Sequence, residues 1–303
     1  MCGRWQGVGM ILVTGATGTI GREVLRLLAG RGMPLRAMTR DASRLSSVED
    51  VEVVRADFEV PETLRDAVAG VDKVFLLTAP GASVPEHDLA MINAARACGV
   101  HKVVKLSAVG GRTPANDGTT PAGWHAPGEQ ALADSGLAWT ALRPSAFASN
   151  ALRWADAIRA GYPVPNLTGT GTQGVVDPRD VAEVAVEALV GAELDGLALT
   201  LTGPDLVSVN DQVAQLSEVL GRPISTVDVP LDAAREQMLA SGLDPSVVDV
   251  AVRGSQLVRD GGNAVVTDDV QRVLGRPARS FRTWALDHRG VLLDPQEPRR
   301  TAR

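Results

Sequence analysis

The chain has 303 residues, of which 45% are hydrophobic and 22% charged, and this is enough for one large globular domain or for one domain with a small second lobe. The net charge is −6 with dispersed basic residues, and two cysteines and four histidines show no zinc spacing, which argues against a nucleic-acid partner and a bound metal. No apolar run reaches membrane-spanning length and no signal peptide begins the chain, so we expect a cytoplasmic protein.

The first half of the chain alternates apolar runs with helical periodicities. The runs predict six strands, at residues 10–14, 35–39, 51–56, 73–78, 101–107 and 138–142. Helices are expected at residues 19–31, 61–69 and 85–98, and another ends at residue 135 after starting near Pro127. Strands that are apolar throughout and separated by helices are typical of a parallel sheet covered on both faces, so we expect a doubly wound α/β fold.

The pattern changes after Pro144. Residues 161–174 are rich in Pro, Gly and Thr and are expected to form a long loop. Asp177 suits a helix N-cap ahead of Pro178, a strand follows at 197–201, and a helix at 208–220 ends at Gly221. From residue 224 onward we expect a small, mostly helical lobe, frayed from about residue 296.

A glycine-rich turn joins the first strand to the first helix. Its glycines are Gly15, Gly18 and Gly21, and its other residues include Thr17, Thr19 and Ile20. Such glycines allow a tight turn, a close approach of backbone to a pyrophosphate, and close packing of the helix on the sheet. The helix N-terminus then offers N–H groups to the phosphates, so the turn predicts a dinucleotide site in a Rossmann domain.

The end of the second strand bears on the choice between NAD and NADP. An NAD site usually has an acidic residue there, whereas this strand ends at Arg40, whose guanidinium can pair with a 2′-phosphate. Arg44 is a second candidate contact. Asp41 is an acidic residue one position after the place where an NAD site usually has one. The charge at Arg40 favours NADPH as the cofactor.

These features suggest a division of the chain. We expect an N-terminal extension at residues 1–9, with Met10 as an alternative start, and a dinucleotide-binding domain at 10–150 that residues 174–205 complete. A smaller substrate lobe would comprise residues 206–303 together with 151–173.

Several segments together resemble one family. The glycine-rich turn, Thr39-Arg40-Asp41, Ala56-Asp57-Phe58, Lys105-Leu106-Ser107-Ala108 and Leu142-Arg143-Pro144 look like the NmrA-like branch of the atypical short-chain dehydrogenase/reductases. The resemblance covers residues 10–205 well and the remainder loosely. The branch includes NADPH-dependent quinone and dye reductases, non-catalytic redox-sensing regulators, and tailoring enzymes of aromatic polyketide pathways.

The resemblance also implies positions around the cofactor. Asp57 and Phe58 should lie beside the adenine, and Thr78, Ala79 and Pro80 should pass near the ribose and pyrophosphate. Ser107, Pro144 and Phe147 should border the nicotinamide.

The usual proton relay of the short-chain dehydrogenases is absent. That relay is Tyr-x-x-x-Lys, but the single tyrosine, Tyr162, precedes Pro163, and no lysine follows Lys105. His125 stands in the corresponding region, with Glu129 four residues later on the same helical face. His125 is either a proton donor near the nicotinamide or a residue that binds a loop carbonyl, and Glu129 either orients it or interacts with the helix dipole.

Other residues are candidates for the acceptor site. Ser107 either binds a carbonyl oxygen of the substrate or caps a loop, and Asn150 either lines the pocket or caps a helix. Trp124 and Phe147 are candidate walls for an aromatic substrate, whereas Trp154 suits either wall or core.

A conjugated acceptor fits this set of residues best. Its reduced anion is delocalised and takes a proton from water, so positioning matters more than a strong acid. We therefore expect an NADPH-dependent reductase of a conjugated aromatic or quinonoid acceptor, either monomeric or homodimeric. The alternatives are a non-catalytic NADP-binding regulator with a protein partner, and a polyketide tailoring oxygenase or epimerase.

Overall fold

The computed structural model describes residues 9–45, 50–110 and 121–294. The expected extension at 1–9, apart from Gly9, and the expected C-terminal fraying lie outside these residues. The described chain forms two compact units, one comprising Met1–Arg143 with Val181–Leu199 and the other Pro144–Asp180 with Thr200–Arg303.

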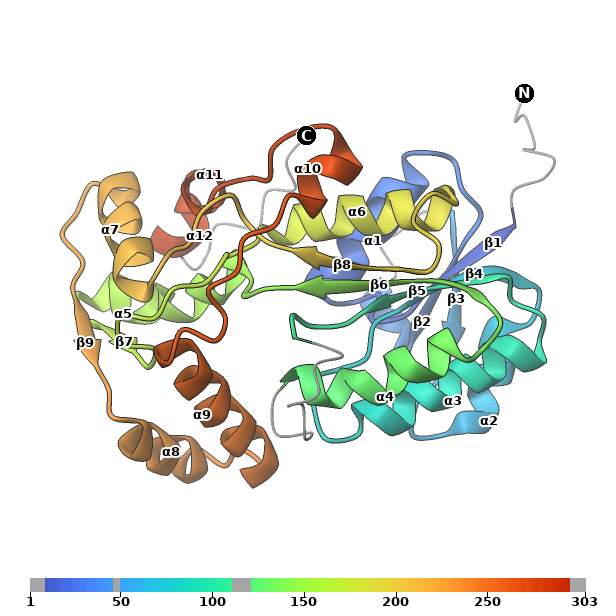
Figure 1. The fold of residues 1–303 in the computed structure, drawn as a ribbon, viewed down its shortest axis with the longest axis horizontal. Helices are drawn as coiled ribbons and strands as arrows, with labels where there is room; N and C mark the ends of the chain where they lie inside the picture. Colours follow the sequence, from blue (N-terminus) through green and yellow to red (C-terminus); the bar gives the residue numbers. More distant parts are fainter. Residues whose placement is uncertain (1–8, 46–49, 111–120, 295–303) are drawn as a thin grey trace. The chain divides into compact units, whose positions relative to one another are not determined.

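A seven-stranded sheet runs in the order β3-β2-β1-β4-β5-β6-β8 (Figure 1). Its strands are β1 (Met10–Val13), β2 (Leu35–Thr39), β3 (Val51–Arg55), β4 (Val71–Leu76), β5 (Lys102–Leu106), β6 (Ala138–Pro144) and β8 (Leu197–Leu201). The pairs from β3 through β6 are parallel. This order reverses between β1 and β4, so a doubly wound fold offers a ligand site at the carboxyl ends of those two strands.

Helices cover both faces of the sheet. In Figure 1, α2 (Pro61–Val68), α3 (Val84–Ala97) and α4 (Pro121–Ala133) lie against one face, while α1 (Thr19–Ala29) and α6 (Pro178–Val190) lie on the other. A short 3₁₀ helix, η1 (Ala42–Leu45), follows β2. The face under α2, α3 and α4 has a continuous core whose fully buried members include Leu12, Leu64, Val74, Met91, Val103 and Leu132. Burial on both faces explains why these strands are apolar along their length.

The second unit has a separate core and is mostly helical, as expected. It contains η2 (Ala148–Trp154), α5 (Ala155–Ala160), α7 (Val209–Leu220), α8 (Leu231–Ala240), α9 (Pro245–Arg259), α10 (Asp269–Leu274), α11 (Phe281–Asp287) and α12 (Arg289–Leu293). Its largest buried side chain is Trp284, and Trp154 packs against the same cluster, which gives Trp154 a core role.

Two expectations about secondary structure are wrong. The segment expected to be a loop contains a short strand, β7 (Val164–Asn166), which pairs in parallel with β9 (Thr226–Asp228). The helix expected to begin near Pro127 begins at Pro121 and contains Pro127 in its interior. His125 is therefore a helical residue.

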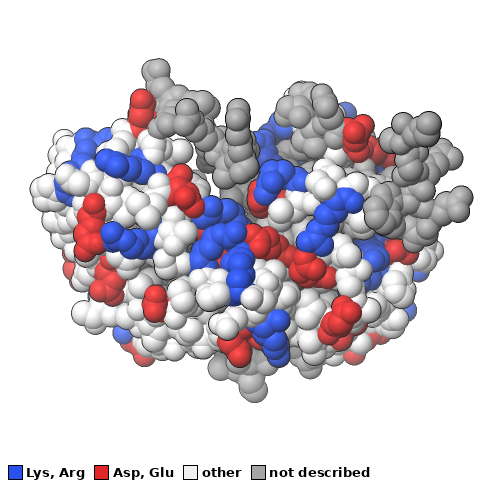
Figure 2. All heavy atoms as spheres, turned by 90° about the horizontal axis from the view of Figure 1, so that it is seen from above, with Lys and Arg blue, Asp and Glu red and all other residues white. Residues whose placement is uncertain are grey.

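Two features of charge and hydropathy bear on partners. On the face that Figure 2 shows, basic and acidic side chains are intermixed, and neither sign forms a continuous track. Within the described ranges, no helix is both long and apolar enough to cross a membrane, and no group of three or more His, Cys, Asp or Glu side chains is placed to hold a metal ion.

Candidate functional site

The turn between β1 and α1 is built on close backbone packing. Gly15 has φ +59°, a left-handed conformation that favours glycine, and its carbonyl accepts a hydrogen bond from the Gly18 amide at 2.9 Å. A Cβ on Gly21 would lie 2.3 Å from Gly15 O. The first turn of α1 thus rests directly on the loop, as the sequence predicts for a dinucleotide-binding turn.

The same turn leaves room for phosphates. Gly18 is exposed, and a Cβ there would meet only Gly15 O, at 3.3 Å. Gly18 is also the N-cap of α1, and no side chain caps the helix. The N–H groups of the first turn are therefore not capped by a side chain, which fits the pyrophosphate of a nicotinamide dinucleotide.

Thr14, which the sequence analysis did not single out, joins β1 to β4 at this edge. Its Oγ1 donates towards Leu77 O at 2.9 Å and Phe75 O at 3.1 Å, and accepts from the Leu77 amide at 2.7 Å. The side chain is fully buried. Thr14 therefore holds together the two strands at which the sheet order reverses.

Arg40 and Asp41 differ in what their side chains contact. Arg40 is exposed at the end of β2, and its side chain makes no hydrogen bond or ion pair with the described residues. The Asp41 carboxylate accepts from the Ser43 amide at 3.0 Å and the Ser43 hydroxyl at 2.7 Å, and these bonds lower its pKa. The Asp41 carboxylate thus accepts hydrogen bonds within its own turn, while the Arg40 guanidinium faces solvent.

The residues expected near the adenine and ribose follow β3 and β4. Asp57 and Phe58 are partly buried, and the Phe58 ring stacks on His87 with centroids 5.3 Å apart. Thr78 is buried, whereas Ala79 and Pro80 are exposed. All of them stand at the carboxyl edge of the sheet, where this fold binds ligands.

A buried ion pair lies next to His125. Lys105 on β5 and Asp88 on α3 are fully buried, with Nζ 2.5 Å from Asp88 Oδ2. Lys105 Nζ also lies 3.0 Å from His125 Nδ1, and Thr78 Oγ1 donates to Asp88 Oδ1 at 3.1 Å. Burial, and next the charge of Lys105, lower the pKa of His125 to about 3, so the imidazole is neutral at physiological pH.

A second buried cluster surrounds Glu129. Ser107 Oγ donates to Glu129 Oε1, and Arg143 donates to both carboxylate oxygens, from Nε at 3.1 Å and from Nη2 at 2.5 Å. Glu129 is buried. Glu129 therefore binds Ser107 and Arg143, and the hydrogen bond to the His125 ring comes from Lys105.

Lys105, Asp88 and Arg143 were missed by the sequence analysis as site residues. Lys105 lies between Val104 and Leu106 in a strand expected to be buried. Burying an unpaired charge costs on the order of several kcal/mol of free energy, so a charged residue in such a strand needs a partner. The position of Lys105 in an apolar strand could have indicated a buried ion pair, although the partner of Lys105, Asp88, lies on another element.

The remaining candidates have diverse environments. In the first unit Trp124 is buried; in the second Pro144 is buried, Phe147 partly buried and Asn150 exposed. Ser145, which follows β6 directly, is 5% exposed, and its Oγ has no hydrogen-bond partner among the described residues. An unpaired buried hydroxyl at the carboxyl end of a strand is a further candidate ligand contact that the sequence analysis did not identify.

Comparisons with known proteins agree with the dinucleotide-binding turn predicted from the glycines. A family profile described as NAD(P)H-binding matches residues 15–191, more than half of the chain. The chain belongs to this NAD(P)H-binding family. The expected resemblance to NmrA-like and quinone or dye reductases is thereby confirmed at the level of the family and its neighbours.

Two similar proteins that are named as reductases align with nearly the whole chain. A (4-alkanoyl-5-oxo-2,5-dihydrofuran-3-yl)methyl phosphate reductase of Streptomyces griseus is 42% identical over 92% of this chain and 98% of its own length. An NAD(P)H azoreductase of Xenophilus azovorans is 36% identical over 92% and 98%. Together with the family match, they identify the chain as an NAD(P)H-dependent reductase and do not favour a regulator, oxygenase or epimerase.

Two solved structures of reductases share the fold. The NADPH complex of an NADPH-dependent quinone oxidoreductase from Escherichia coli superposes with a TM-score of 0.82 at 23% identity, covering 92% of this chain and 99% of that one. The NADP(H) complex of Citrobacter triphenylmethane reductase gives 0.79 at 21% identity, covering 92% and 99%.

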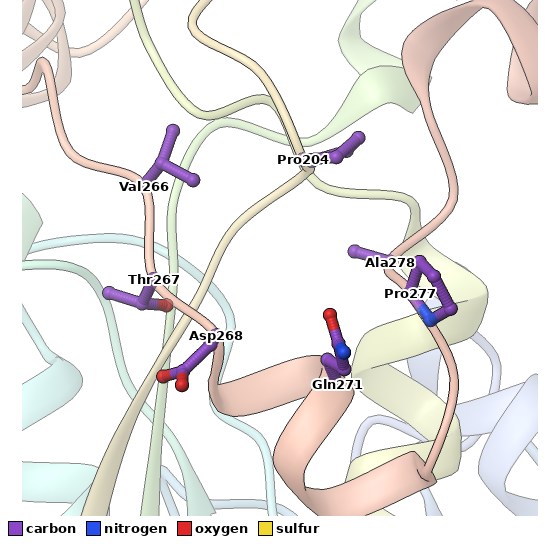
Figure 3. Close-up of a pocket in the computed structure, with 7 residues that line it drawn as sticks. All are labelled: Pro204, Val266, Thr267, Asp268, Gln271, Pro277 and Ala278. Atoms are coloured by element: carbon purple, nitrogen blue, oxygen red, sulfur yellow. The ribbon is translucent and has the colours of Figure 1, made fainter.

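The second unit contains a hollow of its own, about 650 Å³ in volume (Figure 3). It is lined by Pro204, Val266, Thr267, Asp268, Gln271, Pro277 and Ala278. The Thr267 hydroxyl is already hydrogen-bonded within the protein, since it donates to Thr200 O. None of the residues expected to bind the cofactor or the acceptor lines this hollow.

Proposed function

We propose that this reductase delivers hydride from NADPH to a conjugated aromatic or quinonoid acceptor. The supporting observation is the state of its proton-transfer groups. Tyr162, the only tyrosine, is 69% exposed, and His125 is held as a neutral imidazole. Neither is arranged as a strong acid, whereas hydride addition to a conjugated acceptor gives a delocalised anion that water can protonate.

The names of the relatives are consistent with such an acceptor. They act on azo compounds, on quinones, or on a dihydrofuranone that carries an alkanoyl group and a phosphate ester. Under this proposal His125, Ser107 and Trp124 of the first unit lie next to the nicotinamide and the acceptor. The bound cofactor supplies the hydride.

The proposal is tested by following NADPH oxidation with a panel of quinones, azo dyes, triphenylmethane dyes and alkanoyl butenolides, with and without a phosphate ester. We expect turnover with at least one conjugated class and none with simple ketones. Turnover of simple ketones alone would contradict the proposal, as would NADPH binding without oxidation across the whole panel. Running the assay without oxygen separates reduction from oxygen-dependent consumption of NADPH.

The preference for NADPH is tested at Arg40. We expect Arg40→Ser to weaken NADPH binding about tenfold to hundredfold, since a charge-assisted bond to a phosphate contributes roughly 1.5–3 kcal/mol. NADH binding should change less than about twofold, because NADH has no 2′-phosphate. Fluorescence titration with both cofactors measures this, with the exposed Arg65→Ser on α2 as control. Equal losses for both cofactors would contradict the assignment.

A further inference from the structure

The Lys105 ammonium makes three close polar contacts inside the first unit. Nζ lies 2.5 Å from Asp88 Oδ2, 3.0 Å from His125 Nδ1 and 3.3 Å from Leu106 O. An ammonium has three donors and no acceptor, so Nδ1 of His125 must accept in this contact. A neutral imidazole that accepts at Nδ1 carries its hydrogen at Nε2.

Asp88 keeps the ammonium in place. Thr78 donates to its Oδ1 at 3.1 Å, and α4 packs so closely that a Cβ on Gly128 would lie 2.5 Å from Oδ2. The carboxylate is therefore confined between α3, the end of β4 and α4. Glycine at position 128 allows this approach, and the cluster contains residues from four separate elements.

We propose that Lys105 is a positioning residue that locks His125 as the neutral Nε2–H tautomer, so that the ring presents a hydrogen-bond donor to the reducible group. This inference rests on the proposed function, in which His125 lies beside the acceptor. The developing negative charge of the acceptor is then stabilised by an oriented N–H. No proton leaves His125, and the product anion takes its proton from water.

The charged groups around the ring support a neutral imidazole. Lys105 on β5 is the charged group in contact with it, and Asp88 on α3 lies beyond Lys105. His87 on α3 lies 3.0 Å from Glu59, and Glu129 on α4 is bound by Ser107 and Arg143. Because burial and Lys105 both lower the pKa of His125, the positively charged ring forms only in acid.

The same strand provides a matched control. Lys102 is also buried on β5, where its Nζ pairs with Asp195 and donates to Gly191 O at 2.9 Å. Positions 102 and 105 point to opposite faces of the sheet, because side chains alternate along a strand. Removing the Lys102 pair takes a buried lysine and its partly exposed carboxylate partner from the same strand without touching His125.

The first experiment measures the tautomer in the cofactor-free full chain. Histidine is labelled with ¹⁵N, and the His125 signal is assigned with His125→Gln. The double variant Lys105→Met/Asp88→Asn removes both charges together, so that no buried charge is left unpaired. The control is Lys102→Met/Asp195→Asn, and spectra are recorded from pH 4 to pH 8.

We expect the native protein and the control to show neutral His125 with hydrogen on Nε2 down to about pH 5. In the Lys105/Asp88 variant, the pKa of His125 should rise by about one unit or more, and signal from the Nδ1–H tautomer should appear. An unchanged tautomer and pKa in that variant would overturn the proposal. So would an imidazolium at pH 6 in the native protein.

The second experiment uses turnover with an accepted substrate. We expect Lys105→Met/Asp88→Asn to lower kcat at least tenfold and to introduce a pH dependence at the raised pKa of His125, while the KM for NADPH stays within about twofold. The control should keep the native pH profile. A purely structural role would lower activity in proportion to the folded fraction and leave the profile unchanged, which would contradict the proposal.

His125 itself separates hydrogen bonding from proton transfer. A glutamine amide places an N–H near the position of Nε2 but is not an acid, so His125→Gln should keep at least tenfold more activity than His125→Ala. Equal losses would argue against donation from Nε2. If no acceptor is turned over, the proposed function fails, while the NMR result still decides whether Lys105 sets the tautomer.

Discussion

Gly21→Ala is expected to abolish measurable NADPH binding and to destabilise the protein. The added Cβ would lie 2.3 Å from Gly15 O, 2.7 Å from Gly15 C and 3.1 Å from Ala16 Cα. All three atoms belong to the backbone, so no side-chain rotation relieves the overlap. Overpacking typically costs about 1–3 kcal/mol, and here the turn that would hold the pyrophosphate must shift.

The control for this prediction lies at the other end of α1. At Gly30 a Cβ would meet nothing closer than Arg26 O and Leu27 O, both at 3.5 Å, and its φ of −60° suits alanine. Gly30→Ala should keep native affinity and stability. NADPH fluorescence titration and urea unfolding compare the variants. Affinity of Gly21→Ala within threefold of native would show that the turn does not hold the cofactor.

The second large effect is expected at Asp180, which is fully buried in the second unit. Its carboxylate accepts from Arg276 Nη2 at 2.8 Å, from the Arg279 backbone amide at 2.7 Å and from the Arg279 guanidinium. Asp180→Ala removes the carboxylate that accepts from all three donors, so the free energy of unfolding should fall by about 3 kcal/mol, near the lower limit for breaking a buried ion pair. Both arginines are partly exposed, which lets water replace part of the loss.

A solvent-exposed ion pair serves as the comparison. Asp287 is 48% exposed and lies 2.7 Å from Arg179 Nη1, so Asp287→Ala should cost less than about 1 kcal/mol. Urea unfolding measures both variants, and hydrogen exchange should rise around residues 276–281 in Asp180→Ala only. Similar midpoints for the two variants would contradict the structural role of Asp180.

The fold of the first unit follows closely from local sequence patterns. The strand at 35–39 and the strand at 197–201 have the expected limits. In the second unit, α7 ends at Gly221 as expected, and Ser208 is its N-cap rather than its first helical residue. These elements bury apolar residues at regular spacing, which a single sequence displays. The expectation for α4 failed because packing against α3 stabilises a helix that contains Pro127, and this contact joins residues distant in the chain.

The candidate site was predictable only in part, for a similar reason. The glycine-rich turn is contiguous, so its geometry can be read from seven successive residues. The surroundings of His125 are not contiguous, since Asp88, Lys105 and Thr78 come from three elements. Helical spacing placed Glu129 on the same face as His125, yet Glu129 binds Ser107 and Arg143 because the guanidinium on β6 offers two donors. Spacing along one helix could not show that Glu129 would bind Ser107 and Arg143 instead of His125.

The interior placement of the lysines affects how this protein can be handled. Lys102 and Lys105 are buried, and Lys73 Nζ donates to Leu189 O at 2.8 Å, while twenty-seven of the thirty basic residues are arginines. Acylating dyes and amine cross-linkers will therefore react poorly with lysine side chains in the folded state and freely after unfolding. Guanidinium groups keep their protons at any practical pH, so the positive charge of the surface will persist in alkaline buffers that would neutralise a lysine-rich protein.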